Sequence, residues 1–218
     1  MINTFKAKSS NIGYTVKFVF QFAVHPSDIA ILYALKAFFK DAGHISYTNK
    51  YAFYKVENFP SIRDIIIPHF TSYPLQSTKI IPFHLFKAAV EIVDRKEHLD
   101  LDGYRKLLSF KASLKKGKTA TIFQSELFSD IVPFNTEGIF IPNNGALEPE
   151  FIAGFVAADG RFFISKPSAN AKWANYDATF AISQDQRDED LLKRIIITLG
   201  CGSLKKDALT FFINLYII

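Results

Sequence analysis

The sequence predicts an α+β fold of two similar halves, each with antiparallel strands covered on one side by helices. Three observations point to this class. Residues 14–24 alternate between apolar and polar side chains, as a half-buried strand does. An amphipathic helix and a short hairpin follow this strand. The same order of strand, helix and hairpin recurs about 160 residues later, so we expect the chain to contain a duplication.

The first half opens with the strand 14–24. Its apolar face carries Tyr14, Val16, Phe18, Phe20, Phe22 and Val24, and its polar face carries Thr15, Lys17 and Gln21. A helix is expected to begin at Pro26–Ser27, with an inner side formed by Ile31, Leu32, Leu35, Phe38 and Phe39. Residues 45–47 and 51–56 are expected to form a hairpin. We expect the helices to leave open the side of the sheet that bears Lys17, Gln21 and Lys55.

Three more helices are expected at 60–70, with Pro68 at its end or at a kink, at 82–97 and at 99–114. Lysines at 115, 116 and 118 would give the last of these helices a positively charged C-terminus. From 117 to 149, scattered Gly, Pro and Asn separate short apolar runs, so this stretch is expected to wrap the surface and bury Phe123, Leu127, Phe128, Ile131 and Phe134. The expected domains are residues 1–116, a linker at 117–149, and residues 150–218.

The second half is expected to contain a helix at 151–159, strands at 161–166 and 176–184, a helix at 187–199, and a hairpin of residues 204–206 and 209–217. Aligned with the first half, Phe180 takes the place of Phe20, Asp188 of Asp28, and Leu192 of Leu32. Amphipathic elements in one order align loosely by chance, but pairs at a constant separation favour a duplication.

Composition excludes several classes of protein. Of the 218 residues, 49% are hydrophobic, so the chain can build a packed core and is not intrinsically disordered. Its net charge of +5 permits nucleic-acid binding without demonstrating it. Cys201 is the only cysteine, which leaves no intramolecular disulfide, and no apolar run is long enough for a membrane span. Abundant Phe, Ile, Lys and Asn are typical of an AT-rich genome and favour a mitochondrial location.

The stretch 151–160 combines an apolar helix with an acid at its end. Ala153 and Gly154 are small enough to let a second helix approach closely, and Asp159 lies where the helix turns into a strand. A carboxylate at this place suits a divalent cation. The stretch resembles the LAGLIDADG motif of homing endonucleases and RNA maturases, with Asp159 at the metal-binding acid. The alternative is a buried helix that ends by chance in Asp-Gly.

The resemblance extends over nearly the whole chain and includes the spacing of residues 73–79, 86–87, 96–99 and 103. It implies two αββαββα repeats related by a pseudo-twofold axis, with two antiparallel sheets that form a saddle over DNA. The sequence also departs from the family pattern. Ala157 stands where the family usually has its first acid, the first repeat lacks its motif helix, and the second repeat stops inside its hairpin. These departures imply either a partial sequence of a longer protein or an eroded gene.

Members of this family cleave both DNA strands with divalent cations held between one acid from each motif and the scissile phosphates. The resemblance therefore assigns Asp159 as a metal ligand, with Mg²⁺ as the cation of an active enzyme, and Gln184 and Lys79 as the other catalytic residues. Val24 stands where the first repeat would need a counterpart of Gln184. One acid cannot serve both strands, so the resemblance implies impaired cleavage. The alternative for Lys79 is an ordinary turn lysine in solvent.

The polar faces of the strands and hairpins are expected to bind nucleic acid. Lysine and arginine suit phosphates, and uncharged polar side chains can reach base edges. Taken singly, each such residue is more often an ordinary solvated side chain. The expected set is Thr15, Lys17, Gln21, Lys50, Tyr51, Lys55, Arg161, Lys166, Lys172, Thr179, Ser183, Lys205 and Lys206.

Three functions follow from these expectations. The first is a nucleic-acid-binding protein derived from a homing endonuclease that no longer cleaves, bound to an intron RNA or a ribosomal RNA in an organelle, for example within a mitochondrial ribosome. The second is an active endonuclease, represented by an incomplete chain, that makes site-specific double-strand breaks in DNA. The third is a structural subunit that keeps the fold for protein contacts. A membrane partner is expected in none of them.

Overall fold

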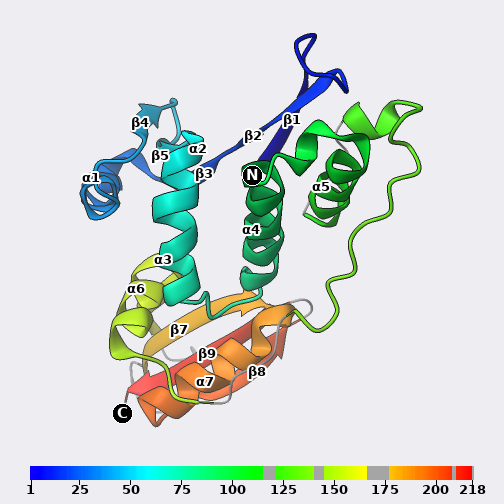
Figure 1. The fold of residues 1–218 in the computed structure, drawn as a ribbon. Coiled ribbons are helices and arrows are strands. Elements are labelled where there is room, and N and C mark those ends of the chain that lie inside the picture. The colour runs from blue at the N-terminus through cyan, green and yellow to red at the C-terminus, as the bar shows by residue number, and fades with distance from the viewer. Residues whose placement is uncertain (115–120, 140–144, 166–176, 208–209, 218) are drawn as a thin grey trace. The chain divides into compact units, whose positions relative to one another are not determined.

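The structure, a computed structural model of the chain, describes residues 1–114, 121–139, 145–165, 177–207 and 210–217 (Figure 1). The chain divides into two compact units. Unit 1 consists of Met1–Leu75 and Lys79–Ile139, and unit 2 consists of Gln76–Thr78 and Phe140–Ile218. The three residues 76–78 therefore belong to unit 2, although the chain on either side of them belongs to unit 1. The basic cluster at 115–118 and the expected binding residues Lys166 and Lys172 lie outside the described residues.

Unit 1 contains two antiparallel sheets with helices packed against one side. The first sheet pairs β1 (Ile2–Lys6) with β2 (Tyr14–Phe18), and the second has the order β3 (Phe20–Val24), β5 (Ala52–Val56), β4 (His44–Tyr47). The helices are α1 (Ile29–Phe38), α2 (Phe59–Ser61), α3 (Ile67–Ser72), α4 (Ile80–Asp94) and α5 (Leu101–Ser113). A π-helical turn, Ile62–Ile66, joins α2 to α3. Pro68 therefore lies within a continuing helix, directly after a turn whose hydrogen-bond pattern already departs from the α-helix, and it does not end the helix.

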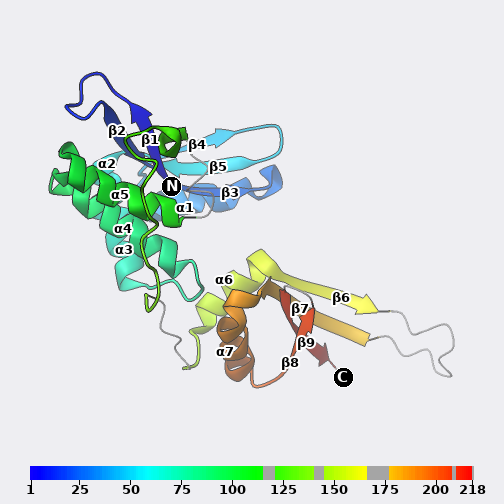
Figure 2. The ribbon, with the colours of Figure 1, turned by 90° about the vertical axis from the view of Figure 1, so that its right-hand side faces the viewer.

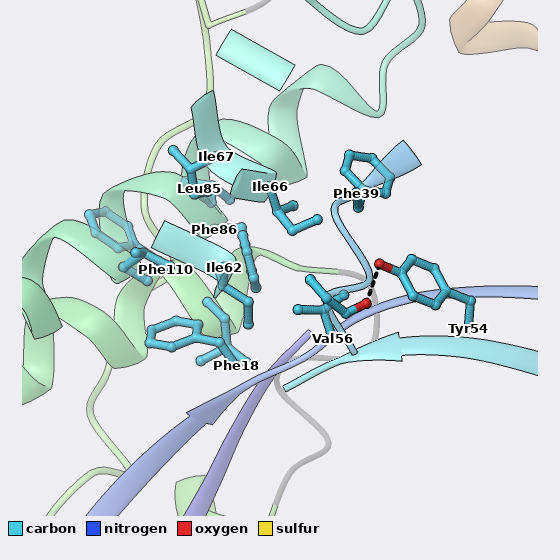
Figure 3. Close-up of a cluster of buried hydrophobic side chains, with 14 of the residues drawn as sticks. Phe18, Phe39, Tyr54, Val56, Ile62, Ile66, Ile67, Leu85, Phe86 and Phe110 are labelled. Carbon is cyan, nitrogen blue, oxygen red and sulfur yellow. Dashed lines mark hydrogen bonds between the residues drawn. The ribbon is translucent and has the colours of Figure 1, made fainter. Parts of the chain in front are cut away.

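The core of unit 1 lies between the sheets and these helices (Figure 3). The strands contribute Phe18, Tyr54 and Val56, and the helices pack Ile66 and Phe86 against them. The Tyr54 hydroxyl is buried and donates a hydrogen bond of 2.7 Å to the carbonyl of Ala42. Burial raises the pKa of Tyr54 to about 12, with a smaller effect from the nearby Asp41 carboxylate.

The expected open side of the sheets is confirmed. Lys17 follows the alternation of β2, in which Phe18 points into the core, and Lys55 lies between the buried Tyr54 and Val56. Gln21 is directly opposite Lys55 in the pairing of β3 with β5. All three side chains therefore face away from the helices.

Two details of the first half differ from expectation. The strand 14–24 is interrupted at the buried Val19, because β2 pairs with β1 while β3 pairs with β5 in a separate sheet. In α1, Leu32 and Phe39 are buried as expected, but Ile31 and Phe38 are 55% and 63% exposed. The sheet contacts one side of α1, and these two residues lie outside that contact.

Gly43 ends the turn after α1, at a position where a larger side chain should destabilise the fold. Its φ is +78°, and a Cβ at this position would lie 2.1 Å from the backbone oxygen of Lys55. Gly43→Ala should therefore lower the free energy of unfolding by roughly 2–4 kcal/mol, the sum of backbone strain and a clash with main chain that cannot move aside. Gly13→Ala is the matched control, because Gly13 has a φ of +74° but no atom within 4 Å of such a Cβ. Its cost should be about 1 kcal/mol. Equal losses in urea unfolding would contradict the clash.

Unit 2 contains a four-stranded antiparallel sheet with α6 (Pro149–Asp159) and α7 (Glu189–Leu199) packed on one side (Figure 2). Its strand order is β6 (Gly160–Ser165), β7 (Asp177–Asp185), β9 (Thr210–Ile217), β8 (Ser203–Asp207). The core is formed by Leu147, Ile152, Phe180, Ile182, Leu191, Leu192 and Ile195. In the part of the chain that the structure describes, no helix has both the length and the apolar character needed to cross a membrane.

Strand pairing in the two units supports the duplication. Phe20 pairs with Val56 in unit 1, and Phe180 pairs with Leu215 in unit 2. Ile45 pairs with Tyr54, and Leu204 pairs with Ile213. Each partner in unit 2 therefore lies 159 or 160 residues after its counterpart. A register kept over three strands in each unit is a stronger sign of duplication than the order of elements alone.

The described part of the connection, residues 121–139, belongs to unit 1 and packs on α5. Ile122 and Phe128 are buried against Tyr104 and Leu108 of α5. The expected burial is incomplete for Leu127 and Phe134, which are 44% and 42% exposed. Short apolar runs in a surface connection bury only those side chains that point toward the helix beneath.

Candidate nucleic-acid interface

Unit 1 presents a polar face on the side of its sheets away from the core. Thr15, Lys17 and Gln21 are exposed on this face, and Lys55 is half-buried. The Lys17 ammonium lies 3.3 Å from the Glu57 carboxylate, an exposed ion pair of small energy that a phosphate could replace. The Lys55 ammonium lies 5.0 Å from the centre of the Phe53 ring, which keeps the side chain extended over the sheet.

The turn between β4 and β5 extends this face. The Thr48 hydroxyl accepts a hydrogen bond of 3.1 Å from the Tyr51 N–H, which fixes the turn locally. Lys50 and Tyr51 are exposed, and the turn residues line a shallow, open hollow. Such a surface suits contact with a macromolecule better than enclosure of a small substrate.

Unit 2 presents a matching face. Arg161 of β6 donates a hydrogen bond of 2.9 Å to the Ser183 hydroxyl of β7, opposite the side that carries Phe180 and Ile182. Lys205 of β8 lies in the same cross-strand row as Ser183, because both pair with residue 212. These side chains share one face because side chains alternate along a strand.

Two expected binding residues do not lie on this face as exposed groups. Thr179 is only 5% exposed, because the ring of Phe163 lies directly opposite it in the pairing of β6 with β7. Lys206 alternates with Lys205 and therefore shares the face of Leu204, which packs on the core. Lys205 and Lys206 are both exposed but point to opposite faces of the sheet, so Lys206 as a binding residue stays a prediction.

The expected catalytic acid lies at the end of α6. Asp159 is exposed, and the Gln184 side-chain amide donates a hydrogen bond of 2.8 Å to one of its carboxylate oxygens. The structure therefore brings Asp159 and Gln184 together. The second carboxylate oxygen fits as an oxygen ligand of a divalent cation, with Gln184 fixing its direction. Within the described residues, no group of three or more His, Cys, Asp or Glu side chains could hold a metal ion.

The other two positions of the expected catalytic site lie in unit 1. Lys79 is exposed and is the residue immediately before α4. Val24 points toward the core, as an apolar residue in β3 should. The described part of unit 2 thus supplies one carboxylate with one amide partner.

The motif helix α6 contradicts one expectation. The sequence predicts that Ala153 and Gly154 pack against the first half of the chain or against whatever replaces its missing helix, but both are exposed. A Cβ built on Gly154 would have no atom within 4 Å. Ile152 is the buried residue of this helix, because it packs toward the sheet of unit 2. The small-residue side of α6 is uncovered in the described part of the chain.

Sequence reasoning missed two buried charged residues in unit 2. Asp188 is 8% exposed and Arg194 is 6% exposed. Asp188 accepts a hydrogen bond of 2.6 Å from the Thr78 N–H, and Arg194 donates to the Gln76 side-chain oxygen and to the Gly145 carbonyl, both at 2.9 Å. Thr78 and Gln76 lie more than a hundred residues away along the chain. Burial lowers the pKa of the Arg194 guanidinium, which still carries its charge. One signal was available: Arg194 directly precedes Ile195 on the apolar side of an amphipathic helix, where a charge needs a partner.

The sequence of this chain is similar to a family model and to two intron-encoded proteins of a fungus. The family model described as "LAGLIDADG endonuclease" matches residues 1–90 and 152–217. "Probable intron-encoded endonuclease 3" of Neurospora crassa is 32% identical over 202 residues, which are 91% of this chain and 37% of that protein. "Probable intron-encoded endonuclease 2" of the same fungus is 30% identical over 212 residues, 93% of this chain and 45% of that protein. The chain spans less than half the length of these two relatives.

Solved structures give the same likeness in fold. I-SmaMI "bound to uncleaved DNA target in the presence of Calcium ions" has a TM-score of 0.88 and 30% identity, covering 100% of this chain and 74% of that one. I-GzeII "in complex with DNA target" has a TM-score of 0.86 and 28% identity, covering 99% of this chain and 73% of that one.

Proposed function

Because the chain belongs to the LAGLIDADG endonuclease family, we propose that it binds double-stranded DNA through the faces of its sheets that point away from the helices. The observation that carries this proposal is the matching placement of cationic and hydrogen-bonding side chains in the two units. Lys17, Gln21 and Lys55 lie on the outward face of unit 1. Arg161, Ser183 and Lys205 lie on the outward face of unit 2.

The chemistry of these groups fits duplex DNA. Lysine and arginine can neutralise phosphates, while Gln21 and Ser183 can donate to and accept from base edges. The major groove of B-form DNA is wide enough for β-strands, whereas the major groove of A-form RNA is deep and narrow. The strands therefore favour DNA over double-stranded RNA. Two similar proteins, I-SmaMI and I-GzeII, whose solved structures contain a DNA target, support the same choice.

We also propose that unit 2 contributes half of a cleavage site. Asp159 would hold a divalent cation such as Mg²⁺, and Gln184 would keep the carboxylate directed toward it. A bound cation of this kind supplies charge neutralisation and water activation at a scissile phosphate. Lys79 would add a positive charge beside the phosphate backbone. One acid serves one strand, so the 218-residue chain should bind DNA without cutting both strands.

Selection from a randomised duplex library tests the proposal. The purified chain should enrich a defined DNA motif, and an excess of structured RNA should compete poorly. RNA that competes as well as the selected duplex would instead favour an RNA-binding function in an organelle. Failure to enrich any motif, with binding that does not change with salt, would favour a purely structural subunit.

A further inference from the structure

We infer that Phe5 of β1 determines part of the DNA sequence preference, by contacting the 5-methyl group of a thymine in the major groove. This inference rests on the proposed function, because it names one base contact made by the outward face of unit 1. It concerns a strand, β1, that contributes none of the side chains on which that proposal depends.

Strand pairing places Phe5 on the outward face of unit 1. Phe5 pairs with Thr15 of β2. Lys17 lies two residues further along β2 and shares the face of Thr15, whereas Phe18 lies on the opposite face and is buried in the core. Paired residues of two neighbouring strands lie on one face, so Phe5 points away from the core, with Thr15 beside it.

Phe5 is an apolar residue on an otherwise polar surface. It is 51% exposed, although the alternation of β1 with β2 would suit a polar side chain at this position. Its neighbours on this face are Asn3 of β1 and Thr15 and Lys17 of β2. An exposed aromatic ring gains free energy only where a partner offers an apolar group to cover it.

The surroundings of Phe5 favour DNA as that partner. Lys17 and Lys8, which lies in the turn after β1, are exposed cations that suit phosphates. A single ring among cations and polar groups does not match the apolar centre of a protein interface, from which charged residues are depleted. It does match a groove whose walls carry phosphates and whose floor carries base edges.

Thymine is the base that a phenyl ring can distinguish in the major groove. The base edges there present hydrogen-bond donors and acceptors, and thymine alone adds a methyl group. The ring of Phe5 can neither donate to nor accept from the polar edge atoms in a conventional hydrogen bond. It therefore favours thymine at the base pair that it meets, while Asn3 and Thr15 beside it can bond to polar edges.

Replacement of thymine by uracil tests the inference, because the two bases differ only by this methyl group. Each thymine of the duplex motif selected by the wild-type chain is replaced in turn by deoxyuridine, and affinity is measured by fluorescence anisotropy. At one position the replacement should weaken wild-type binding about fourfold, the effect of burying one methyl-sized group. Phe5→Ala should bind the thymine and uracil duplexes of that position equally, since the methyl group then has no ring to contact.

Phe38→Ala is the matched control, because Phe38 is a 63% exposed phenylalanine on α1, which packs on the other side of the sheet. It should leave the fourfold effect of uracil unchanged. Phe5→Leu keeps an apolar end that can still contact the methyl group, so a smaller preference for thymine should remain. This variant also tests the inference in case Phe5→Ala does not fold.

The outcomes separate this inference from the proposed function. An effect of uracil that is equally large in the wild type, Phe5→Leu and Phe5→Ala would overturn the inference alone. A wild-type chain that binds its motif but responds to no thymine replacement would also overturn it, because Phe5 would then not read the methyl group. A wild-type chain that selects no duplex motif would overturn the proposed function, and the inference with it.

Discussion

Alanine at Lys17, Lys55, Arg161 and Lys205 together is expected to weaken duplex binding on the order of a thousandfold near 0.1 M salt. These four side chains lie on the outward faces of the two sheets, and each can neutralise a phosphate. Each lost contact lowers the slope of log affinity against log salt concentration by about 0.9, so the variant should lose about 3–4 in slope. Fluorescence anisotropy of a labelled duplex over a series of salt concentrations gives both quantities.

The matched control removes four cations from helices and helix ends, namely Lys36, Arg95, Lys106 and Lys193. Both variants lose the same net charge, so a general effect of charge would weaken both equally. The control variant should keep most of the wild-type affinity and of the slope of log affinity against log salt concentration. Similar losses in the two variants would show that the sheet faces are not the binding surface.

The second large effect concerns cleavage. With Mg²⁺ and a plasmid library that carries the selected motif, the 218-residue chain should produce no linear plasmid. Asp159 is the acid that unit 2 offers at the end of its motif helix, and a double-strand break needs such an acid for each strand. Nicked plasmid is compatible with this expectation. Linear product that disappears in Asp159→Asn would overturn it.

The same acid should affect binding in Ca²⁺, where cleavage does not interfere. Ca²⁺ should raise the DNA affinity of the wild type about tenfold, or ~1.4 kcal/mol. Asp159→Asn should abolish this increase. Gln184→Ala should reduce this increase only in part, because Gln184 directs the carboxylate through a hydrogen bond of 2.8 Å. Asp190→Asn should leave this increase unchanged, because Asp190 is a partly exposed acid on α7 that pairs with Lys193. An equal response in Asp159→Asn and the wild type would remove Asp159 from the proposed site.

Local patterns in the sequence predict most of the elements. The alternation in residues 52–56 places Tyr54 in the core and Lys55 outside it, as the structure confirms. Helical spacing predicts the burial of Leu191, Leu192 and Ile195 in α7. These patterns succeed because strand and helix periods decide which face can be apolar.

Other features depend on contacts that local patterns do not contain. The strand is interrupted at Val19 because β2 pairs with β1, whereas β3 pairs with β5. Thr179 is buried because Phe163 lies opposite it on the neighbouring strand. The bond between Thr78 and Asp188 joins residues that lie 110 positions apart. Helical spacing can mark Arg194 as a charge on the apolar side of a helix, but only the folded chain identifies Gln76 as its partner.

Lysine footprinting tests the central claim most directly, because it uses the unaltered chain. The protein is acetylated with and without the selected DNA duplex, and protection of each lysine is measured by mass spectrometry. The account predicts protection of Lys17, Lys55 and Lys205 on the outward sheet faces, and no change at Lys106 of α5 and Lys193 of α7. Protection of the helix lysines with the strand lysines still reactive would contradict the proposed DNA-binding surface.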